Sequence, residues 1–358
     1  MTAFLAQPFR FRFGPRLCLR PAISTLAALL SGTLAAAGVP GPGYTLSGHV
    51  GLGPGKRWDY ITVDAPSHRI YLARADKVEV VDTRSLARIG TISGLHGTHG
   101  VALAPALGRG FISDGKGNAV VVFDLASLAI LRTVPVGGNP DAIVFDPVTG
   151  RVATFNGASH DASILDAARG EVIALSVPLG GKPEFARVDG AGHAFLNIED
   201  TAEIVDLDLA KAAVHGRYSI APCEEPTGLA RSPAGQLVSV CQNHVAVISD
   251  PKTGKVLSTV AIGEHPDGVV IDDGYAYSAN GGDGTISAVP LGPQAGAVPG
   301  TIASRRSART IDVDPATHTL YLPSLAAKAA QGAASPGGTP STAPADADEI
   351  EILVFSRS

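Results

Sequence analysis

A strand-like motif recurs seven times along the 358-residue chain, and this repetition limits the available folds more than any other feature. The copies share an apolar run that ends, in most of them, in an acidic residue: Ile61–Asp64, Val101–Ala104, Ile143–Asp146, Ala186–Asp189, Leu229–Ser232, Val269–Asp272 and Ile311–Asp314. Their last residues are spaced 40, 42, 43, 43, 40 and 42 positions apart, and further apolar runs mark three more strands in the best-preserved units. Four short strands in a unit of about 40–45 residues are typical of one β-propeller blade. We therefore predict an all-β, seven-bladed β-propeller with four-stranded blades.

The two ends of the chain predict how the ring closes. The seventh unit supplies strands at 311–314, 320–322 and 350–355, one fewer than a complete blade. The missing pattern lies near the other end, at Val50–Gly53. We expect the N-terminal strand to complete the C-terminal blade, which removes an exposed sheet edge. The propeller then spans 44–358 as one domain. Residues 324–348, rich in Ala, Gly, Pro and Ser, are predicted to be a flexible low-complexity insertion in blade 7.

The first 37 residues have the pattern of a targeting segment. They contain four arginines and no acidic residue, followed by an apolar run from Pro21 that ends in three alanines. This pattern predicts a secretory signal peptide over 1–37, cleaved after Ala37, with an uncleaved membrane anchor as the alternative. Cleavage would change the formal net charge from −5 to −9. The expected product is a periplasmic or secreted monomer without a membrane span, and its acidic balance argues against nucleic acid as a partner.

Seven different side chains occupy one repeating position, five residues before the end of each first strand: Asp59, His99, Asp141, Glu184, Thr227, Asp267 and Arg309. If each first strand lines the central channel, this position lies where the chain enters the channel, at one mouth. Carboxylates suit a cation or an amine, and Arg309 suits an anionic group. The alternative is that these residues solvate the channel and cap turns. The predicted ligand-binding residues are Trp58, Asp59, His99, Asp141, Glu184, Glu225, Asp267 and Arg309.

Four of these residues form a candidate metal site: Asp59, His99, Asp141 and Asp267. Their donor atoms suit a hard or borderline divalent cation, although no local ligand spacing supports one. The sequence has no motif for covalent haem or for a nucleotide, and none for a flavin. No residue is singled out as a catalytic nucleophile, so a catalytic role is not favoured.

Two cysteines remain after signal removal, Cys223 and Cys241. Cys223 precedes the first strand of blade 5 and Cys241 follows its second strand, so an antiparallel hairpin brings both to the same end of the blade. In an oxidising compartment we expect them to form a disulfide, with free thiols or metal ligands as alternatives.

The repeat units resemble the YVTN-type β-propeller repeat, and the whole chain after the signal peptide is similar to YncE-family proteins. The segments that carry the resemblance are Trp58–Asp64, His99–Pro105, Asn139–Ile143, Lys182–Ala186, Ala221–Gly228 and Ala308–Thr310. The resemblance implies an exported seven-bladed propeller. It does not imply a reaction, because such propellers serve both as binding platforms and as enzyme subunits.

Three functions fit these observations. The first is a binding or scaffold propeller whose acidic channel mouth takes an unidentified small ligand, a cation or a protein partner. The second is a metal-assisted hydrolase, such as a lactonase, with its cation at the mouth. The third is an accessory partner of a periplasmic redox system. In the third case the chain would be a partner and not a redox carrier, because the sequence contains no cofactor motif. We favour the first function.

Overall fold

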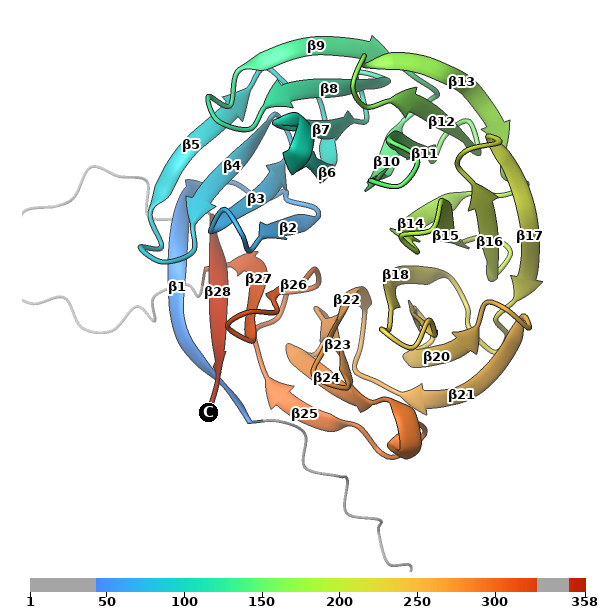
Figure 1. Cartoon of the computed structure of the whole chain (residues 1–358). Helices are drawn as coiled ribbons and strands as arrows, with labels where there is room; N and C mark the ends of the chain where they lie inside the picture. Colours follow the sequence, from blue (N-terminus) through green and yellow to red (C-terminus); the bar gives the residue numbers. More distant parts are fainter. Residues whose placement is uncertain (1–42, 327–347) are drawn as a thin grey trace, which may run out of the picture. The chain divides into compact units, whose positions relative to one another are not determined.

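The computed structural model describes residues 43–326 and 348–358, and within them seven four-stranded antiparallel sheets form a ring of blades (Figure 1). The predicted signal peptide and most of the predicted insertion lie outside these residues. Blade 1 comprises β2 (Ile61–Asp64), β3 (Arg69–Arg74), β4 (Lys77–Asp82) and β5 (Arg88–Ser93). Blade 2 comprises β6 (Thr98–Ala104), β7 (Arg109–Asp114), β8 (Ala119–Asp124) and β9 (Ile130–Pro135). Blade 3 comprises β10 (Pro140–Asp146), β11 (Arg151–Asn156), β12 (Asp161–Asp166) and β13 (Glu171–Pro178).

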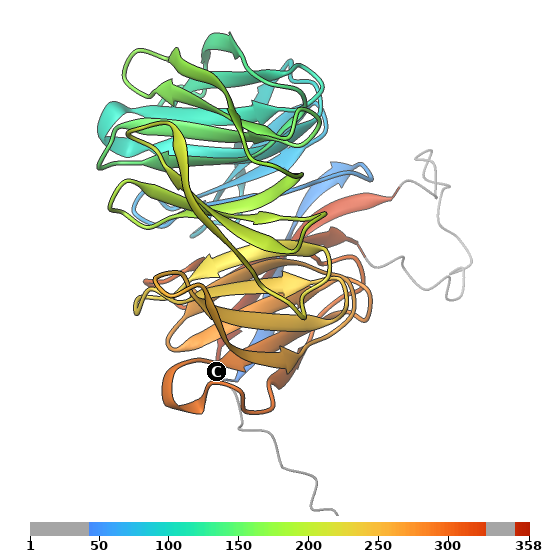
Figure 2. The same ribbon diagram turned by 90° about the vertical axis from the view of Figure 1, so that its right-hand side faces the viewer.

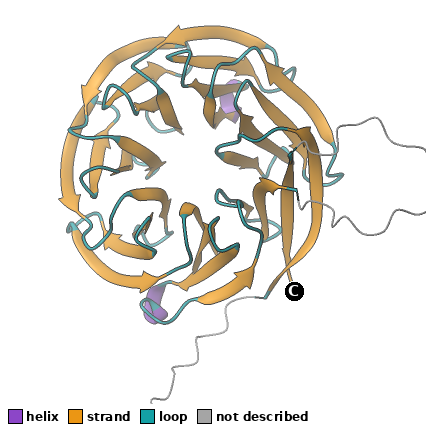
Figure 3. Ribbon diagram, turned by 180° about the vertical axis from the view of Figure 1, so that it is seen from behind, coloured by secondary structure: helices purple, strands orange, loops and turns teal. Residues whose placement is uncertain are grey.

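Blades 4 to 7 comprise β14 (Pro183–Val188), β15 (His193–Ile198), β16 (Glu203–Asp208) and β17 (Ala213–Ser219); β18 (Pro226–Arg231), β19 (Leu237–Cys241), β20 (Val245–Asp250) and β21 (Lys255–Ala261); β22 (Pro266–Asp272), β23 (Tyr275–Asn280), β24 (Thr285–Pro290) and β25 (Gly300–Ala303); and β26 (Asp312–Asp314), β27 (Thr319–Leu325), β28 (Glu349–Arg357) and β1 (Tyr44–Pro54). Two short 3₁₀ turns, η1 (Pro105–Leu107) and η2 (Gly292–Gln294), are visible in Figure 3. No helix in the described part of the chain is long and apolar enough to cross a bilayer. The predicted fold is confirmed.

Strand β1 closes the ring, as the sequence predicted. It pairs antiparallel with β28, with Leu46 opposite Phe355 and Val50 opposite Ile352. The two strands run side by side in Figure 2, although they come from opposite ends of the propeller sequence. Strand β27 continues to Leu325, so the first two residues of the predicted insertion belong to a strand, and residues 327–347 lie outside the described residues.

Apolar side chains pack between neighbouring blades because the two middle strands of a blade bury both faces. One such cluster joins blades 7 and 1, where Val50 and Ile352 pack with Trp58, Ile61 and Ile70. The outermost strands instead alternate between exposed and partly buried positions, as in β21. The first strand of each blade therefore lies innermost and lines the channel, and this fixes the place of the polar residues that precede it (Figure 1).

Cys223 and Cys241 form a disulfide with a Cα–Cα distance of 5.5 Å, which confirms the predicted pairing. Both residues are buried, and the bridge links the loop before β18 to the end of β19. The double variant Cys223→Ala/Cys241→Ala should lose about 3 kcal/mol of unfolding free energy, because an 18-residue separation is no longer cross-linked in the unfolded chain. Chemical denaturation checks this loss. Reduction of the wild-type protein should give a similar loss, and unchanged stability in both experiments would contradict the prediction.

Candidate cation site at the channel mouth

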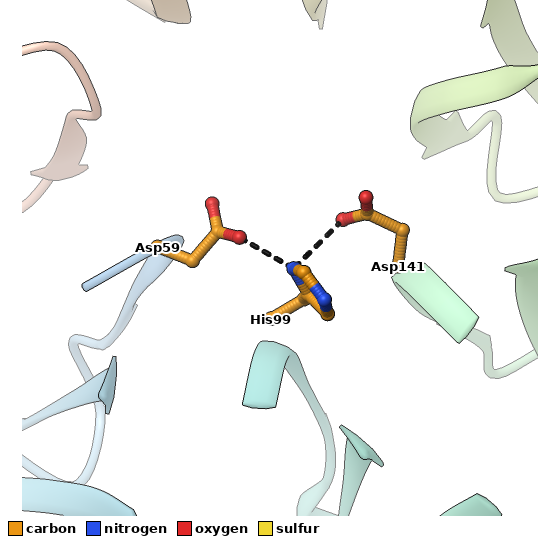
Figure 4. Close-up of side chains that lie close together, drawn as sticks. All are labelled: Asp59, His99 and Asp141. Carbon is orange, nitrogen blue, oxygen red and sulfur yellow. Dashed lines mark hydrogen bonds and ion pairs between the residues drawn. The ribbon is translucent and has the colours of Figure 1, made fainter. Parts of the chain in front are cut away.

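Three side chains from three successive blades meet at one mouth of the channel: Asp59 before β2, His99 in β6 and Asp141 in β10. The His99 Nδ1 atom lies 2.6 Å from Asp59 Oδ2 and 3.5 Å from Asp141 Oδ1. Figure 4 shows the imidazole between the two carboxylates. One donor atom from each residue lies within 4.8 Å of the others, so the three side chains could hold one metal ion.

A local irregularity of the first strand directs these side chains. In blades 2 to 6 the pairing between the first two strands shifts register just after the strand begins, for example between Thr98 and Val101 and between Pro140 and Ile143. A register shift of this kind bends a strand and re-aims the side chains within it. His99 and Asp141 lie inside these irregular segments, so they point toward the channel axis rather than along the blade.

A glycine in the neighbouring turn makes room for His99. A Cβ atom at Gly115, which follows β7, would lie 2.6 Å from His99 Nε2 and 2.8 Å from Asn139 Oδ1. Any larger residue at position 115 would push the imidazole away. Gly115 therefore leaves His99 free to turn its Nδ1 atom toward the two carboxylates.

The charges in this group perturb one another. Burial alone would lower the pKa of His99, but the hydrogen bond to Asp59 and the charges of Asp141 and Asp59 raise it to about 8. Burial and the charge of Asp59 raise the pKa of Asp141 to about 7. Asp141 Oδ1 is also shielded from solvent, and within the described residues it accepts no hydrogen bond and has only the ion pair with His99. The negative charge of Asp141 therefore lacks a full counter-charge, and the imidazolium form of His99 supplies only part of it.

Two further carboxylates lie at the same mouth, each beside a cation. Burial, together with the charges of Asp141 and Glu199, raises the pKa of Glu184 well above its usual range, and Lys182 Nζ lies 3.6 Å from Glu184 Oε2. The same Lys182 also pairs with Glu199. Glu199 follows the second strand of blade 4, in a loop that could rim the mouth, and it is not one of the predicted ligand-binding residues because it lies outside the repeating position.

Asp267, predicted from the sequence as a fourth metal ligand, pairs with Arg309 instead. Its Oδ2 atom accepts a hydrogen bond of 2.7 Å from Arg309 Nε, and burial and the charge of Asp59 raise its pKa to about 6. Arg309 Nη2 also donates to the Trp58 carbonyl at 3.2 Å, and its guanidinium lies over the Trp58 ring. Within the described residues the potential metal-ligand group contains Asp59, His99 and Asp141 without Asp267.

The other predicted mouth residues have different surroundings. Glu225 is exposed, and its side chain makes no hydrogen bond or ion pair within residues 43–326 and 348–358. Its backbone is left-handed, with a φ of 47°, and the potential metal-ligand group does not include it. Thr227, which shares the repeating position, is buried, and its hydroxyl donates to the carbonyls of Pro266 and Val240. Its role is to join blades 5 and 6.

A cavity of about 770 Å³ opens beside two of the three potential ligands. Asp59 and His99 line it together with Trp58, Lys116 and Arg309. Lys116 lies in the turn after β7, outside the repeating position from which the site residues were predicted. The mouth thus combines a negatively charged group of ligands with a substrate-sized space bordered by cations.

Two aromatic rings cross the channel beneath this mouth. Tyr60 and Phe185 pack edge to face, with ring centroids 4.7 Å apart and planes at 74°. They come from blades 1 and 4, at the position that follows Asp59 and Glu184. Blades 2, 5 and 6 carry Gly100, Gly228 and Gly268 at this position, and a Cβ at Gly228 would lie 2.9 Å from the Asp267 carbonyl oxygen.

Comparison with known proteins shows the fold alone. No protein-family model matches this sequence, and no curated protein sequence matches it. Among solved structures, a chain of Kuenenia stuttgartiensis hydrazine synthase is similar with a TM-score of 0.66 and 14% identity, over 82% of this chain and 95% of that one. The U3-55K structure is similar with a TM-score of 0.65 and 8% identity, over 84% and 97%. The chain is a seven-bladed β-propeller.

Proposed function

We propose that this chain is an exported, YncE-like binding propeller whose channel mouth binds a divalent metal cation through Asp59, His99 and Asp141. The observation that carries the proposal is the convergence of three donor atoms from three blades within 4.8 Å. Asp141 Oδ1 supports it, because this oxygen is shielded from solvent and accepts no hydrogen bond from the part of the chain that the structure describes. The buried disulfide supports export, because such bridges persist in oxidising compartments.

The donor set indicates which cations would bind. One imidazole nitrogen and two carboxylates suit borderline first-row ions such as Mn²⁺, Co²⁺ or Zn²⁺. Ca²⁺ prefers six to eight oxygen ligands, and three protein donors of which one is nitrogen would serve it poorly. Because Asp59 and His99 also line the cavity of about 770 Å³, the remaining coordination positions would be open to a ligand there.

Titration calorimetry with Mn²⁺, Co²⁺, Zn²⁺ and Ca²⁺ tests the proposal. The metal-free protein should bind one first-row ion, and Asp141→Asn should weaken that binding at least about thirtyfold, because one of three protein ligands loses its charge. Asp76→Asn is the matched control: Asp76 is exposed and lines the same cavity, but it lies outside the ligand group. It should change the affinity less than about threefold. Equal affinities of the two variants would contradict the proposal.

Metal affinity should depend steeply on pH. His99 has a pKa of about 8, so below pH 8 the metal must displace a proton from the imidazole. The association constant should therefore rise about tenfold per unit between pH 7 and 8, and more steeply below pH 7, where Asp141 is also protonated. Calorimetry in buffers of different ionisation enthalpies should register the released proton. An affinity that is flat from pH 6 to 8.5 would exclude His99 as a ligand.

A metal-assisted hydrolase is the second candidate, favoured by the cavity that shares Asp59 and His99 with the ligand group. A cation there would polarise an ester carbonyl held in the cavity and lower the pKa of a bound water. The test is hydrolysis of a panel of lactones and aryl esters by the Zn²⁺- and Mn²⁺-loaded protein. Turnover lost in Asp141→Asn and kept in Asp76→Asn would establish it. Metal binding without turnover would leave the binding function alone.

A further inference from the structure

Blade 4 departs from the other blades in its second and third strands. In blades 1 to 3 the first residue of the second strand is an arginine, which pairs with the last residue of the third strand, and in blade 4 this residue is His193. Two residues before the end of the third strand, blade 4 carries Asp206. In four other blades this position holds a buried aliphatic side chain: Val80, Val122, Ile164 and Ile248.

The fourth strand of blade 4 departs from the repeat as well. Its pairing with the third strand skips His215, between the pairs Asp206–Gly216 and Leu207–Val214. Such a bulge re-aims the side chain of the extra residue. Four other blades skip a residue at the same place, and there it is an exposed aliphatic one: Ile89, Leu131, Ile173 and Leu257.

These three unusual side chains lie together. The His193 Nδ1 atom donates a hydrogen bond of 2.7 Å to Asp206 Oδ1. The ring of His215 packs edge to face with that of His193, with centroids 5.3 Å apart and planes at 80°. Within the described residues, no hydrogen bond uses His193 Nε2 or either ring nitrogen of His215. Because other blades fold with aliphatic residues at two of these positions, the fold does not require the group, and its free nitrogens are available to a ligand.

The change from arginine to His193 also leaves a space between blades 4 and 5. In blades 1 and 2 the arginine at this position crosses to the next blade and donates to the carbonyl of the first residue after its third strand: Arg69 to Leu125 and Arg109 to Ala167. The equivalent residue of blade 5 is Pro251, and the shorter His193, held by Asp206, makes no such contact in the described part of the chain. His193 and Pro251 instead border a groove of about 870 Å³, open to solvent.

The groove combines aromatic walls with two unpaired cations. Phe195 and Tyr218 line it together with the two imidazoles. Arg231 Nε is shielded from solvent and has no hydrogen-bond partner, and the Lys252 ammonium has no acceptor within residues 43–326 and 348–358. A Cβ atom at Gly235 would lie 3.6 Å from Arg231 Nη2, so the guanidinium lies beside a turn that lines the groove.

The other charged residues of the groove already have partners. Asp206 accepts the hydrogen bond from His193, and Asp189 Oδ1 accepts hydrogen bonds of 2.7 and 3.0 Å from the Ala191 and His193 amides. Arg217 pairs with Glu203 at 3.2 Å. The charges without a partner in the groove are therefore positive, which favours an anionic ligand.

We propose that this groove between blades 4 and 5 is a second ligand site, which binds a small aromatic carboxylate. The carboxylate would accept charge-assisted hydrogen bonds from Arg231 and Lys252, and the ring would pack against the imidazoles and Tyr218. The turns that line the groove join first to second and third to fourth strands of blade 5, so they lie at the opposite end of the strands from the mouth. The site therefore does not depend on a metal at the mouth.

A ¹⁹F NMR titration of the metal-free protein with 4-fluorobenzoate tests this site, at constant ionic strength set by chloride. The wild-type protein should bind one equivalent with a dissociation constant on the order of 0.1–1 mM, because the probe has few heavy atoms and the groove is open. The uncharged 4-fluorobenzamide should bind at least about tenfold more weakly, because it lacks the charge that Arg231 and Lys252 recognise.

Variants locate the binding. Arg231→Gln should weaken it about tenfold, because a charge-assisted contact is lost. His215→Leu introduces the residue that blades 2 and 5 carry, so the blade should fold, and the loss of the imidazole should weaken binding about fivefold. Lys255→Gln is the matched control: Lys255 is exposed and close in sequence to Lys252, but it does not line the groove, and its affinity should equal that of the wild type.

Three results would overturn the proposal. The first is no binding by the wild type at probe concentrations up to about 10 mM. The second is equal affinity for the carboxylate and the amide. The third is that His215→Leu and Arg231→Gln bind as tightly as Lys255→Gln, because a probe bound elsewhere would be insensitive to both. Should Arg231→Gln fail to fold, the loss expected for His215→Leu, at an exposed position, still decides the matter.

Discussion

Replacing Val50 with Asp should lower the unfolding free energy by about 4 kcal/mol, whereas the same change at Leu46 should lower it by less than about 1 kcal/mol. Both residues belong to β1 and both face a partner in β28. Val50 is 5% exposed and packs in the cluster between blades 7 and 1, whereas Leu46 is 51% exposed. A carboxylate at position 50 would be buried without a cation, and one at position 46 would be solvated.

Chemical denaturation of the two variants beside the wild type measures the difference. Val50→Asp should also expose the edge of β28, so we expect it to aggregate at concentrations at which Leu46→Asp stays monodisperse. Equal stabilities of the two variants would mean that β1 does not close the ring.

Asp141→Asn should stabilise the metal-free protein at pH 8.5 by about 2 kcal/mol and leave its stability at pH 4 nearly unchanged. The folded-state pKa of Asp141, about 7, lies above its ordinary value of 3.8. The folded state therefore binds the proton more tightly than the unfolded state does. The stability that Asp141 contributes is complete below about pH 4 and is lost as the pH rises through 7. The amide removes the buried charge that causes this loss.

Protonation of His99 and of Asp267 also stabilises the folded state. The pKa of each is raised in the folded state, to about 8 and about 6, so each contributes stability that is lost as the pH rises through that value. The wild-type protein without metal should therefore lose stability between pH 5 and 8, and a bound cation should restore it. Thermal denaturation at several pH values, with and without Zn²⁺, measures both effects. A variant Asp141→Asn that is destabilised equally at pH 4 and pH 8.5 would contradict the charge repulsion described here.

The repeat predicted most of the fold because each blade has to bury apolar middle strands against its neighbours. The same pattern in Val50–Gly53 located the closing strand, although β1 proved longer, at Tyr44–Pro54, because it pairs with β28 along most of its length. The positions of Cys223 and Cys241 predicted the disulfide, because an antiparallel hairpin places them together. These results depend on backbone periodicity, which a sequence shows directly.

Side-chain partners were harder to predict, because they depend on the distances between blades. The repeating position identified Asp59, His99 and Asp141, but it could not show that Asp267 pairs with Arg309 instead of joining them. Glu225 lies two residues before Thr227, outside the repeating position, and it is exposed and not part of the potential metal-ligand group.

The charged residues Arg187 and Asp312 gave no sequence signal. Arg187 and Asp312 occupy strand positions where apolar or small residues prevail in the other blades, and only the ring brings them to one cavity. A sequence repeat thus shows which positions face the channel, while the structure shows which of them meet.

Crystals grown with Zn²⁺ and measured at the zinc absorption edge would show whether the mouth binds a cation. We expect one anomalous peak at the mouth, about 2.0–2.2 Å from His99 Nδ1 and from a carboxylate oxygen of each of Asp59 and Asp141. A mouth without a peak at saturating Zn²⁺, or a peak bonded to Asp267 and not to His99, would contradict it.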